Sequence, residues 1–386
     1  MGFSQGTWLG LRTPKPLTAF VLLLPSTASH FTPLCNFYVP AMVSSSERED
    51  ASPLLKREIM WRDRYTMLES HGYRLRQRYK PDWKPSWLGT KRLAFLHEDF
   101  HKRDSASSID ALRVSDGRRV FLKRVPFNSQ EIVIHRFLSQ PDRLEDPNNH
   151  TAPLLDTFAD DKYPHFSYLV LPLLRNYFDP EFYFVDEVVD FIGQLLDGLS
   201  YMHMAGVAHR DCSILNIKMD ADPLFPKGFH PTASILDASG SKPAYPKRRR
   251  DVDGVRYYFI DFGISSKFEL GEERKVTGID GQDDEVPELS ESVPYNPFQT
   301  DIFIIGNLVR KEFLKKYTNL NFLEPLVEDL IDQNPRERSK ASEAKANSRD
   351  LHFDGDSKRR TQARSLASSR TSKVFTGRPL SLPKRH

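Results

Sequence analysis

Residues 207–216 read VAHRDCSILN, and they come directly after a long stretch with helical periodicity. In that stretch apolar side chains recur at spacings of three and four, which predicts one buried helix. The residues with this spacing are Val185, Val188, Val189, Ile192, Leu195, Leu196, Leu199 and Met202. The quoted residues lack the periodicity, so we expect a loop that presents His209, Arg210, Asp211 and Asn216 beyond the end of a core helix.

The chain before this helix favours strands, and the chain after the loop favours helices again. Asp116-Gly117 separates two half-apolar runs and is a hairpin signal. In SYLVLPLL, Pro172 should end the pairing of a buried strand. The predicted strands are 107–112, 119–125 and 167–174, and the further predicted helices are 130–138, 301–314 and 323–331. Strands first and helices later indicate an α+β fold.

This order of elements resembles the eukaryotic protein kinase superfamily, because seven motifs occur in the order that the family has. They are Lys123 in VFLK, Glu131 on the next helix, His209-Arg210-Asp211 with Asn216, Asp261-Phe262-Gly263 after YYFI, Val286-Pro287-Glu288, Asp301 with Gly306, and Arg338 in NPRER. One such motif alone is weak, whereas seven in order are specific. The resemblance implies a bilobal fold with a small β-rich N-lobe at about 83–172 and a larger helical C-lobe at about 173–345.

The resemblance also implies an activity, the ATP- and Mg²⁺-dependent transfer of phosphate to a protein hydroxyl, on serine or threonine rather than tyrosine. Lys123 would hold the α- and β-phosphates, oriented by an ion pair with Glu131. Leu171, on the strand 167–174, would contact the nucleotide. The expected partner is therefore a protein substrate, or a scaffold partner if the fold is not active.

Three polar residues are expected to share the metal and acceptor roles. By resemblance, Asp261 and Asn216 would hold Mg²⁺ through their oxygen atoms, which are the hard donors that this ion prefers. Asp211 would accept or orient the proton of the substrate hydroxyl.

The resemblance further implies two contacts within the helical lobe and one regulatory site. Glu288 should pair with Arg338, and Asp301 should cap the backbone of the loop that begins at His209. Because Arg210 precedes Asp211, the chain looks like kinases that are switched by phosphorylation of a loop, and Thr277 is the candidate acceptor.

The chain departs from the family at the nucleotide loop, where glycines normally let backbone amides approach phosphate. No glycine lies between Gly89 and Gly117, and only the small polar run DSASS at 104–108 could substitute. Phe121 stands where the family has a small residue against the adenine, and strand alternation places it on the same face as Lys123.

Two departures concern the groups that steady Asp211 in the family. Ser213 stands where serine/threonine kinases have a lysine, and Gly281 stands seven before Glu288, where they have a threonine. We therefore expect these supports to be missing. Two alternatives to an active kinase stay open: a pseudokinase that serves as an interaction scaffold, and a small-molecule phosphotransferase of related fold.

The remaining segments read as additions to the domain at 83–345. Residues 47–82 are a charged segment leading onto it, and residues 1–46 and 346–386 are expected to be disordered, the latter as a basic tail. The insertion at about 221–255 contains the basic run 247–250. We expect it to be solvated, with a docking loop or a nuclear-import patch as alternatives.

Composition and charge bear on the partners and the cellular location that we expect for the protein. With 55 Lys+Arg against 52 Asp+Glu, the net charge of +3 gives no strong field toward nucleic acid or anionic membrane. The apolar run at 17–24 has the rough shape of a signal peptide but is too short to span a bilayer, and Met42 could be the initiator. Cys35 and Cys212 suggest neither a disulfide framework nor a zinc site. We expect a cytoplasmic or nuclear monomer without stable membrane insertion.

Overall fold

The structure, a computed structural model, describes residues 54–350 and 378–382. Its largest sheet is antiparallel, with five strands in the order β1-β2-β3-β5-β4. The strands are β1 (Tyr73–Arg74), β2 (Ser108–Arg113), β3 (Arg119–Pro126), β4 (Asp156–Ala159) and β5 (Phe166–Pro172). The predicted hairpin is confirmed as β2 and β3, and β3 also pairs with β5, where Phe121 lies opposite Leu171.

One face of this sheet is covered by the N-terminal segment rather than by solvent. Alternate side chains such as Ile109 and Leu122 are fully buried there, against Trp61 of α1 (Lys56–Arg62) and Leu68 of α2 (Tyr65–Ser70). This segment was expected only to lead onto a domain beginning at 83. It belongs instead to the same packed unit, because its aromatic residues supply the apolar cover that the sheet needs.

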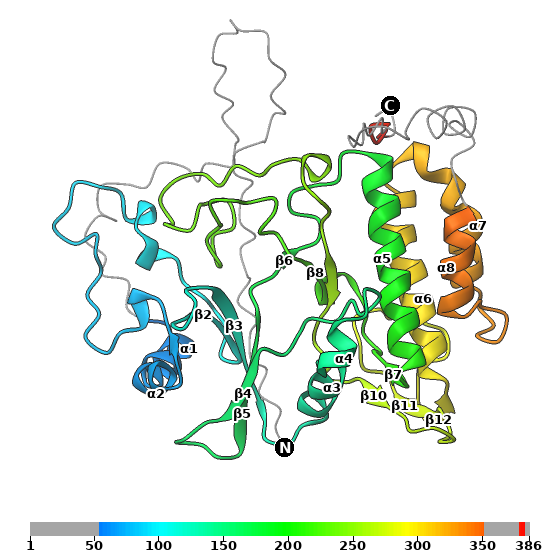
Figure 1. The fold of residues 1–386 in the computed structure, drawn as a ribbon, viewed down its shortest axis with the longest axis horizontal. Coiled ribbons are helices and arrows are strands. Elements are labelled where there is room, and N and C mark those ends of the chain that lie inside the picture. The colour runs from blue at the N-terminus through cyan, green and yellow to red at the C-terminus, as the bar shows by residue number, and fades with distance from the viewer. Residues whose placement is uncertain (1–53, 351–377, 383–386) are drawn as a thin grey trace, which may run out of the picture. The chain divides into compact units, whose positions relative to one another are not determined.

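Four helices form most of the second part of the fold and lie side by side in Figure 1. They are α5 (Val185–Met204), α6 (Pro297–Val309), α7 (Glu324–Leu330) and α8 (Ala341–Asp350), and a π-helical turn at Arg310–Leu314 continues α6. The long helix predicted from spacings of three and four is confirmed as α5, whose Leu195, Leu199 and Met202 are fully buried. Two shorter helices, α3 (Gln130–Leu138) and α4 (Pro141–Leu144), lie between strands of the sheet in the sequence.

Short strands hold the loops that carry the predicted motifs. They are β6 (Arg175–Asn176), β7 (Val207–Ala208), β8 (Ile217–Met219), β9 (Tyr257–Phe259), β10 (Ser266–Lys267), β11 (Val276–Gly278) and β12 (Ser290–Tyr295). β8 pairs with β6 and β9, while β7 pairs with β10. The loop 209–216 therefore runs from one small sheet to the other, and the loop after β9 returns between the same two sheets.

The insertion at 221–255 packs on the protein and is not the solvated loop that we expected. Phe225 and Phe229 are buried on the guanidinium of Arg175. Within the basic run, Arg249 is buried and donates to the carbonyl oxygens of Tyr177 and Pro180. Arg249 therefore serves as internal packing, whereas Lys247 and Arg248 of the same run are exposed.

The insertion also touches the segment between β1 and β2. His230 Nε2 lies 3.2 Å from Glu98 Oε1, and His101 Nε2 lies 3.2 Å from the carbonyl oxygen of Gly240. Added to Gly240, a Cβ would come within 3.0 Å of the Glu98 Cα, so glycine fits this close approach. We call the contact between Glu98 and His230 the rim contact.

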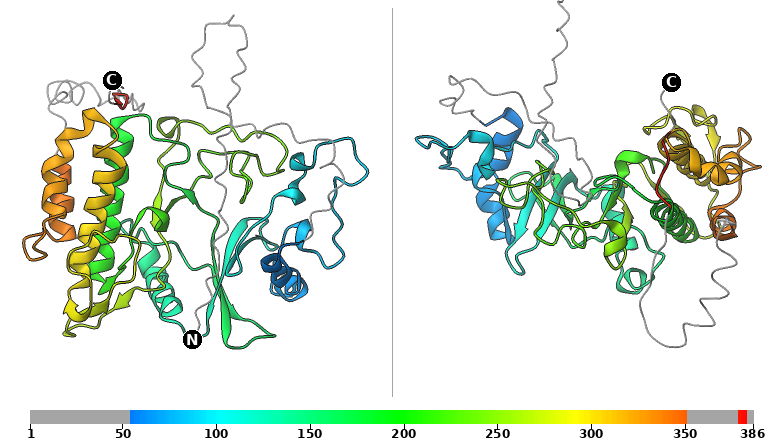
Figure 2. Two further views of the ribbon diagram at one scale, coloured as in Figure 1. Left: turned by 180° about the vertical axis from the view of Figure 1, so that it is seen from behind. Right: turned by 90° about the horizontal axis from the view of Figure 1, so that it is seen from above.

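Part of the predicted basic tail is ordered against the helices. Leu380 donates its N–H to the carbonyl oxygen of Tyr183 at 2.9 Å, and Val185 donates to that of Arg378 at 3.0 Å. On the other side, Thr318 donates to the carbonyl oxygen of Ser381 at 2.8 Å. Figure 2 shows this short red segment near the start of α5. The expectations for residues 1–46 and for Met42 lie outside the described residues.

The α+β class is confirmed, because an antiparallel sheet and a group of helices occupy successive parts of the chain. None of the helices formed by the described residues combines the length and apolar character that crossing a membrane would need.

Candidate functional site

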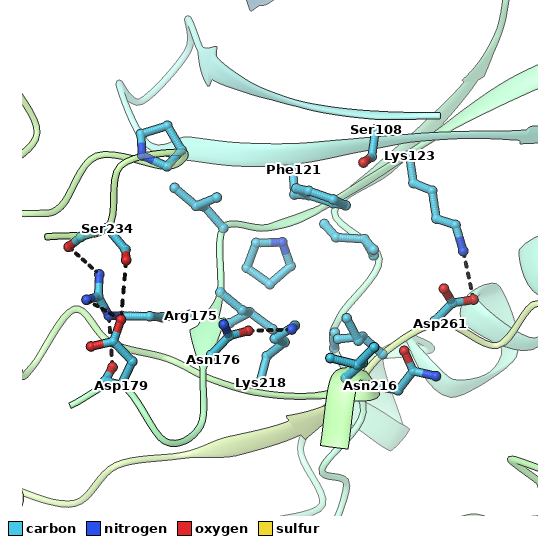
Figure 3. Close-up of a pocket in the computed structure, with 18 of the residues that line it drawn as sticks. Ser108, Phe121, Lys123, Arg175, Asn176, Asp179, Asn216, Lys218, Ser234 and Asp261 are labelled. Atoms are coloured by element: carbon cyan, nitrogen blue, oxygen red, sulfur yellow. Dashed lines mark hydrogen bonds and ion pairs between the residues drawn. The ribbon is translucent and has the colours of Figure 1, made fainter. Parts of the chain in front are cut away.

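A cavity of about 650 Å³ lies between the large sheet and the loops around β8. Four of the six predicted site residues line it: Lys123 and Leu171 from the sheet, and Asn216 and Asp261 from the loops. Figure 3 shows Lys123 reaching down from the strand toward Asp261 on the opposite wall. The structure therefore brings together residues that are up to 138 positions apart in the sequence.

Lys123 is held by two carboxylates. Its Nζ lies 2.7 Å from Oε1 of Glu131 on α3 and 2.8 Å from Oδ1 of Asp261. Burial acts to lower the pKa of Lys123, but the charges of Glu131 and Asp261 outweigh it and leave that pKa above its ordinary value. The expected pairing of Lys123 with Glu131 is confirmed, and the lysine is a fixed positive charge at the edge of the cavity.

Asp261 is the more accessible of the two carboxylates, with 45 % of its side chain exposed against 5 % for Glu131. Burial acts to raise the pKa of Asp261, but the nearby ammonium of Lys123 outweighs it and holds the pKa below its usual value. The backbone of Asp261 has a φ of +65°, an unfavourable conformation for a residue other than glycine. Such conformations cost about 1–3 kcal/mol and gather at functional sites, so Asp261 is presented to the cavity against local preference.

Phe262 fixes the loop that carries Asp261. Its ring is fully buried between His135 of α3, with ring centres 4.9 Å apart, and His209, with ring centres 5.1 Å apart. Burial lowers the pKa of His135 to about 3, so this histidine is neutral near pH 7. The sequence reasoning did not predict this stack, which connects α3 to the loop 209–216 through a single ring.

Asp301 of α6 organises the loop 209–216 from beneath. Its carboxylate accepts the backbone N–H groups of His209 at 2.8 Å and Arg210 at 2.6 Å. Arg210 has a φ of +68°, and these bonds hold it there. The predicted cap is confirmed, as is the predicted pair of Glu288 and Arg338 at 2.7 Å.

Asp211 is surrounded by donors rather than left unsupported. Asn216 Nδ2 donates to its Oδ2 at 2.8 Å, and Ser213 Oγ donates to its Oδ1 at 3.1 Å. Gln282 donates twice, from its backbone N–H and from its side-chain Nε2, each at 3.0 Å. The lysine and threonine expected to be missing are absent, but other donors replace them: Ser213 supplies one bond, and the residue after Gly281 supplies two.

Gly281 is what lets Gln282 reach Asp211. Its φ is +126°, and an added Cβ would lie 3.2 Å from the carbonyl oxygen of Arg210. A larger residue would push this segment away from the loop 209–216, so the glycine that looked like a loss allows the close approach.

Phe121 forms part of the roof of the cavity, as strand alternation predicted, and the cavity of about 650 Å³ remains open beneath it. The connection from β1 to β2, residues 75–107, contains all but the last residue of the run DSASS. Its last residues fold into a serine turn, in which the backbone N–H of Ser108 donates to Ser105 Oγ at 3.1 Å. Ser107 and Ser108 line the cavity, which agrees with the expected place of the DSASS run.

Sequence reasoning missed three cations in the cavity wall, Arg103, Arg175 and Lys218. Arg103 lies at the roof, with its guanidinium carbon 5.0 Å from the centre of the Phe121 ring. Lys218 lies in the floor on β8, where its Nζ donates to Asn176 Oδ1 at 2.6 Å. No strand was predicted at β8, so no sequence pattern placed Lys218 in the cavity.

The oxygen donors in the cavity fit a partly protein-bound magnesium ion. Within residues 54–350 and 378–382, no group of three or more His, Cys, Asp or Glu side chains forms a metal site. Asp261 and Asn216 nevertheless both face the cavity and are hard donors. Magnesium is usually held by one or two carboxylates together with water and ligand phosphates, so two protein donors suit an ion completed by a phosphate ligand.

Thr277, the candidate phosphorylation site, lies exposed on β11, and its carbonyl oxygen accepts a hydrogen bond from Arg210 Nη2 at 3.0 Å.

A comparison of the sequence with models of known protein families gives no match, and neither does a comparison with curated proteins.

Proposed function

We propose that the protein is a protein kinase, which transfers phosphate from ATP to a serine or threonine hydroxyl of a protein substrate. The observation that carries the proposal is the fixed position of Lys123 between Glu131 and Asp261 at a cavity of about 650 Å³. Cavities of this size accommodate small-molecule ligands and cofactors. A two-lobed kinase-like arrangement, with the sheet as one lobe and the helices as the other, is part of this proposal.

Lys123 and Asp261 act on the phosphates in this proposal. The transition state of phosphoryl transfer carries negative charge on the phosphoryl oxygens and depends mainly on positioning and charge stabilisation. Lys123 contacts the α- and β-phosphates, and Glu131 keeps its ammonium in place. Asp261 and Asn216 would hold Mg²⁺, which when bound neutralises phosphate charge.

Asp211 acts on the acceptor. The hydroxyl oxygen of the substrate forms a bond to the γ-phosphorus, the bond from that phosphorus to the ADP oxygen breaks, and the hydroxyl proton passes to Asp211. The donors Asn216 and Ser213 keep the carboxylate oriented while this happens. Gln282 occupies the exposed side of Asp211 and must give up a bond when a substrate hydroxyl arrives.

A pseudokinase scaffold is the second candidate, and the lack of any glycine between Gly89 and Gly117 favours it. Against it stands the open cavity beneath Phe121, because a ring that filled the nucleotide space would leave no such volume. The protein partner would then be a scaffold partner rather than a substrate. The proposed location is the cytoplasm or the nucleus, as a monomer.

The test separates nucleotide binding from transfer. Asp261→Asn should abolish the Mg²⁺-dependent part of ATP binding in calorimetry, while Asp211→Asn should leave binding intact and abolish transfer of labelled phosphate to a generic protein acceptor. The exposed Asp253→Asn, in the insertion, is the matched control and should behave as the wild type. Loss of ATP binding in both variants alike would contradict the assigned roles, and a wild type that binds ATP without transfer would favour the scaffold.

A further inference from the structure

Two cations in the cavity wall have only neutral hydrogen-bond partners. Arg103 donates from Nε to the carbonyl oxygen of Ser108 at 3.1 Å and from Nη2 to Ser108 Oγ at 3.2 Å. Lys218 donates to the amide oxygen of Asn176. Among the described residues no carboxylate lies within ion-pair distance of either. Arg175, in the same cavity, instead pairs with Asp179 at 2.7 Å.

The serine turn holds Arg103 in the wall of the cavity. Ser105 Oγ and Ser108 Oγ lie 2.9 Å apart, and together with the backbone bond they fix the turn to which the guanidinium is attached. The ring of Phe121 supports the guanidinium from the other side. A guanidinium has five N–H donors, and the two bonds to Ser108 leave three for a ligand.

Lys218 faces Arg103 from the opposite wall. Both side chains line the same cavity, Arg103 beside the Phe121 ring of β3 and Lys218 on β8. Burial lowers the pKa of Lys218, and the positive charge of Arg103 lowers it further. Burial likewise lowers the pKa of Arg103. Two cations that are partly withdrawn from water and repel each other are unfavourable in the free protein, and an anion between them relieves both effects.

We propose that Arg103 and Lys218 clamp the phosphates of the bound nucleotide from opposite walls of the cavity, in place of a glycine-rich loop. The clamp rests on the proposed function for the identity of its ligand. A glycine-rich loop offers backbone amides to phosphate oxygens, whereas a guanidinium offers two parallel N–H groups and a full charge. The clamp therefore explains how the chain can bind a nucleotide without glycines between residues 90 and 116.

The experiment compares ligands that differ only in phosphate content. Calorimetry would measure the affinities of adenosine, ADP, ATP and inorganic tripolyphosphate for the wild type, Arg103→Gln and Lys218→Gln. Each variant should bind ATP and tripolyphosphate about tenfold to a hundredfold more weakly, as for the loss of a charged hydrogen bond. Adenosine should change less than about twofold, because it lacks the group that the clamp holds.

A control variant and a folding check distinguish the loss of a phosphate contact from a general effect of substitution. Arg118→Gln removes an arginine whose side chain is 80 % exposed in the β2–β3 hairpin, outside the cavity, and should leave all affinities unchanged. Melting curves establish that each variant is folded. A wild type that binds ATP with unchanged affinity in both variants, or equal losses for adenosine and ATP, would overturn the clamp and leave the proposed function standing. Binding of tripolyphosphate that depends on Arg103, without any binding of ATP, would support the clamp and overturn the proposed function.

Discussion

Arg338 holds Glu288 through two parallel hydrogen bonds, 2.7 Å to Oε1 and 2.9 Å to Oε2, although fifty positions separate them. The guanidinium is fully buried and the carboxylate is 9 % exposed. Arg338 also donates to the carbonyl oxygen of Asp332 at 2.7 Å. The pair thus attaches the end of the segment that carries Gln282 to the helices, and either partner alone would be a buried charge.

Removing one partner of this pair should destabilise the protein strongly. We expect Glu288→Ala and Arg338→Ala each to lower the free energy of unfolding by about 3–5 kcal/mol, and the double variant to lower it by less than the sum. Urea denaturation measures all three. The exposed pair Arg248 and Asp251, with the same 2.7 Å distance, is the matched control and should matter little. Additive losses at Glu288 and Arg338 would show that the two residues do not interact.

Phe121 should contribute to nucleotide affinity rather than oppose it. Because the cavity stays open beneath the ring, a base can stack on it, and Phe121→Ala should weaken ATP and adenosine alike by about 1–3 kcal/mol. Calorimetry on both ligands gives the answer. Phe127→Ala, which removes a ring that is 53 % exposed just after β3, should leave both affinities unchanged. Tighter ATP binding by Phe121→Ala would mean that the ring occupies the place of the base.

His135 should make the protein less stable in mild acid. Its pKa is about 3 in the folded protein and about 6.5 in an unfolded chain, so between these values only the unfolded chain binds the proton. Its contribution is fully present above pH 6.5 and is lost as the pH falls, by about 2 kcal/mol from pH 7 to pH 5.

The variant His135→Leu should reduce this pH dependence by that amount, as measured by urea denaturation at each pH. His165→Leu, at an exposed position, leaves the buried histidine in place and should keep the slope of the wild type. The same slope in His135→Leu as in the wild type would show that the stack around Phe262 admits a proton.

The ordered C-terminal segment should stabilise the helices to which it binds. Leu380 packs partly buried against the main core, so Leu380→Asp should lower the free energy of unfolding by about 1–2 kcal/mol. Thermal melting measures the change. Leu382→Asp places the same charge at a side chain that is 70 % exposed and should melt as the wild type does. An unchanged melting temperature in Leu380→Asp would mean that the segment does not bind there in solution.

Elements whose sequence pattern lies within the element itself could be predicted from the sequence. The predicted helix at 130–138 is confirmed as α3, with the same bounds, because its apolar residues face one side and Glu131 begins its first turn. The pairing of Lys123 with Glu131, and the cap from Asp301 to the loop 209–216, followed from the order of motifs along the chain. These are contacts that the motif residues make with one another.

Contacts that depend on the rest of the fold could not be predicted. The pair of Arg78 and Glu58 is fully buried, although the sequence places both in a charged segment that was expected only to lead onto the domain. Arg249 lies in an insertion that was expected to be solvated, but it is buried. Its burial could not be predicted, because its backbone acceptors come from residues 68 to 72 positions away. Gln282 belongs to no motif, and only its position next to Asp211 in space reveals its role.

The rim contact between Glu98 and His230 bears on how fast a ligand exchanges. The segments on either side of it supply Arg103 and Phe229 to the wall of the cavity, whereas Glu98 and His230 do not line the cavity themselves. We therefore expect the contact to affect the rates of ligand entry and exit more than the dissociation constant.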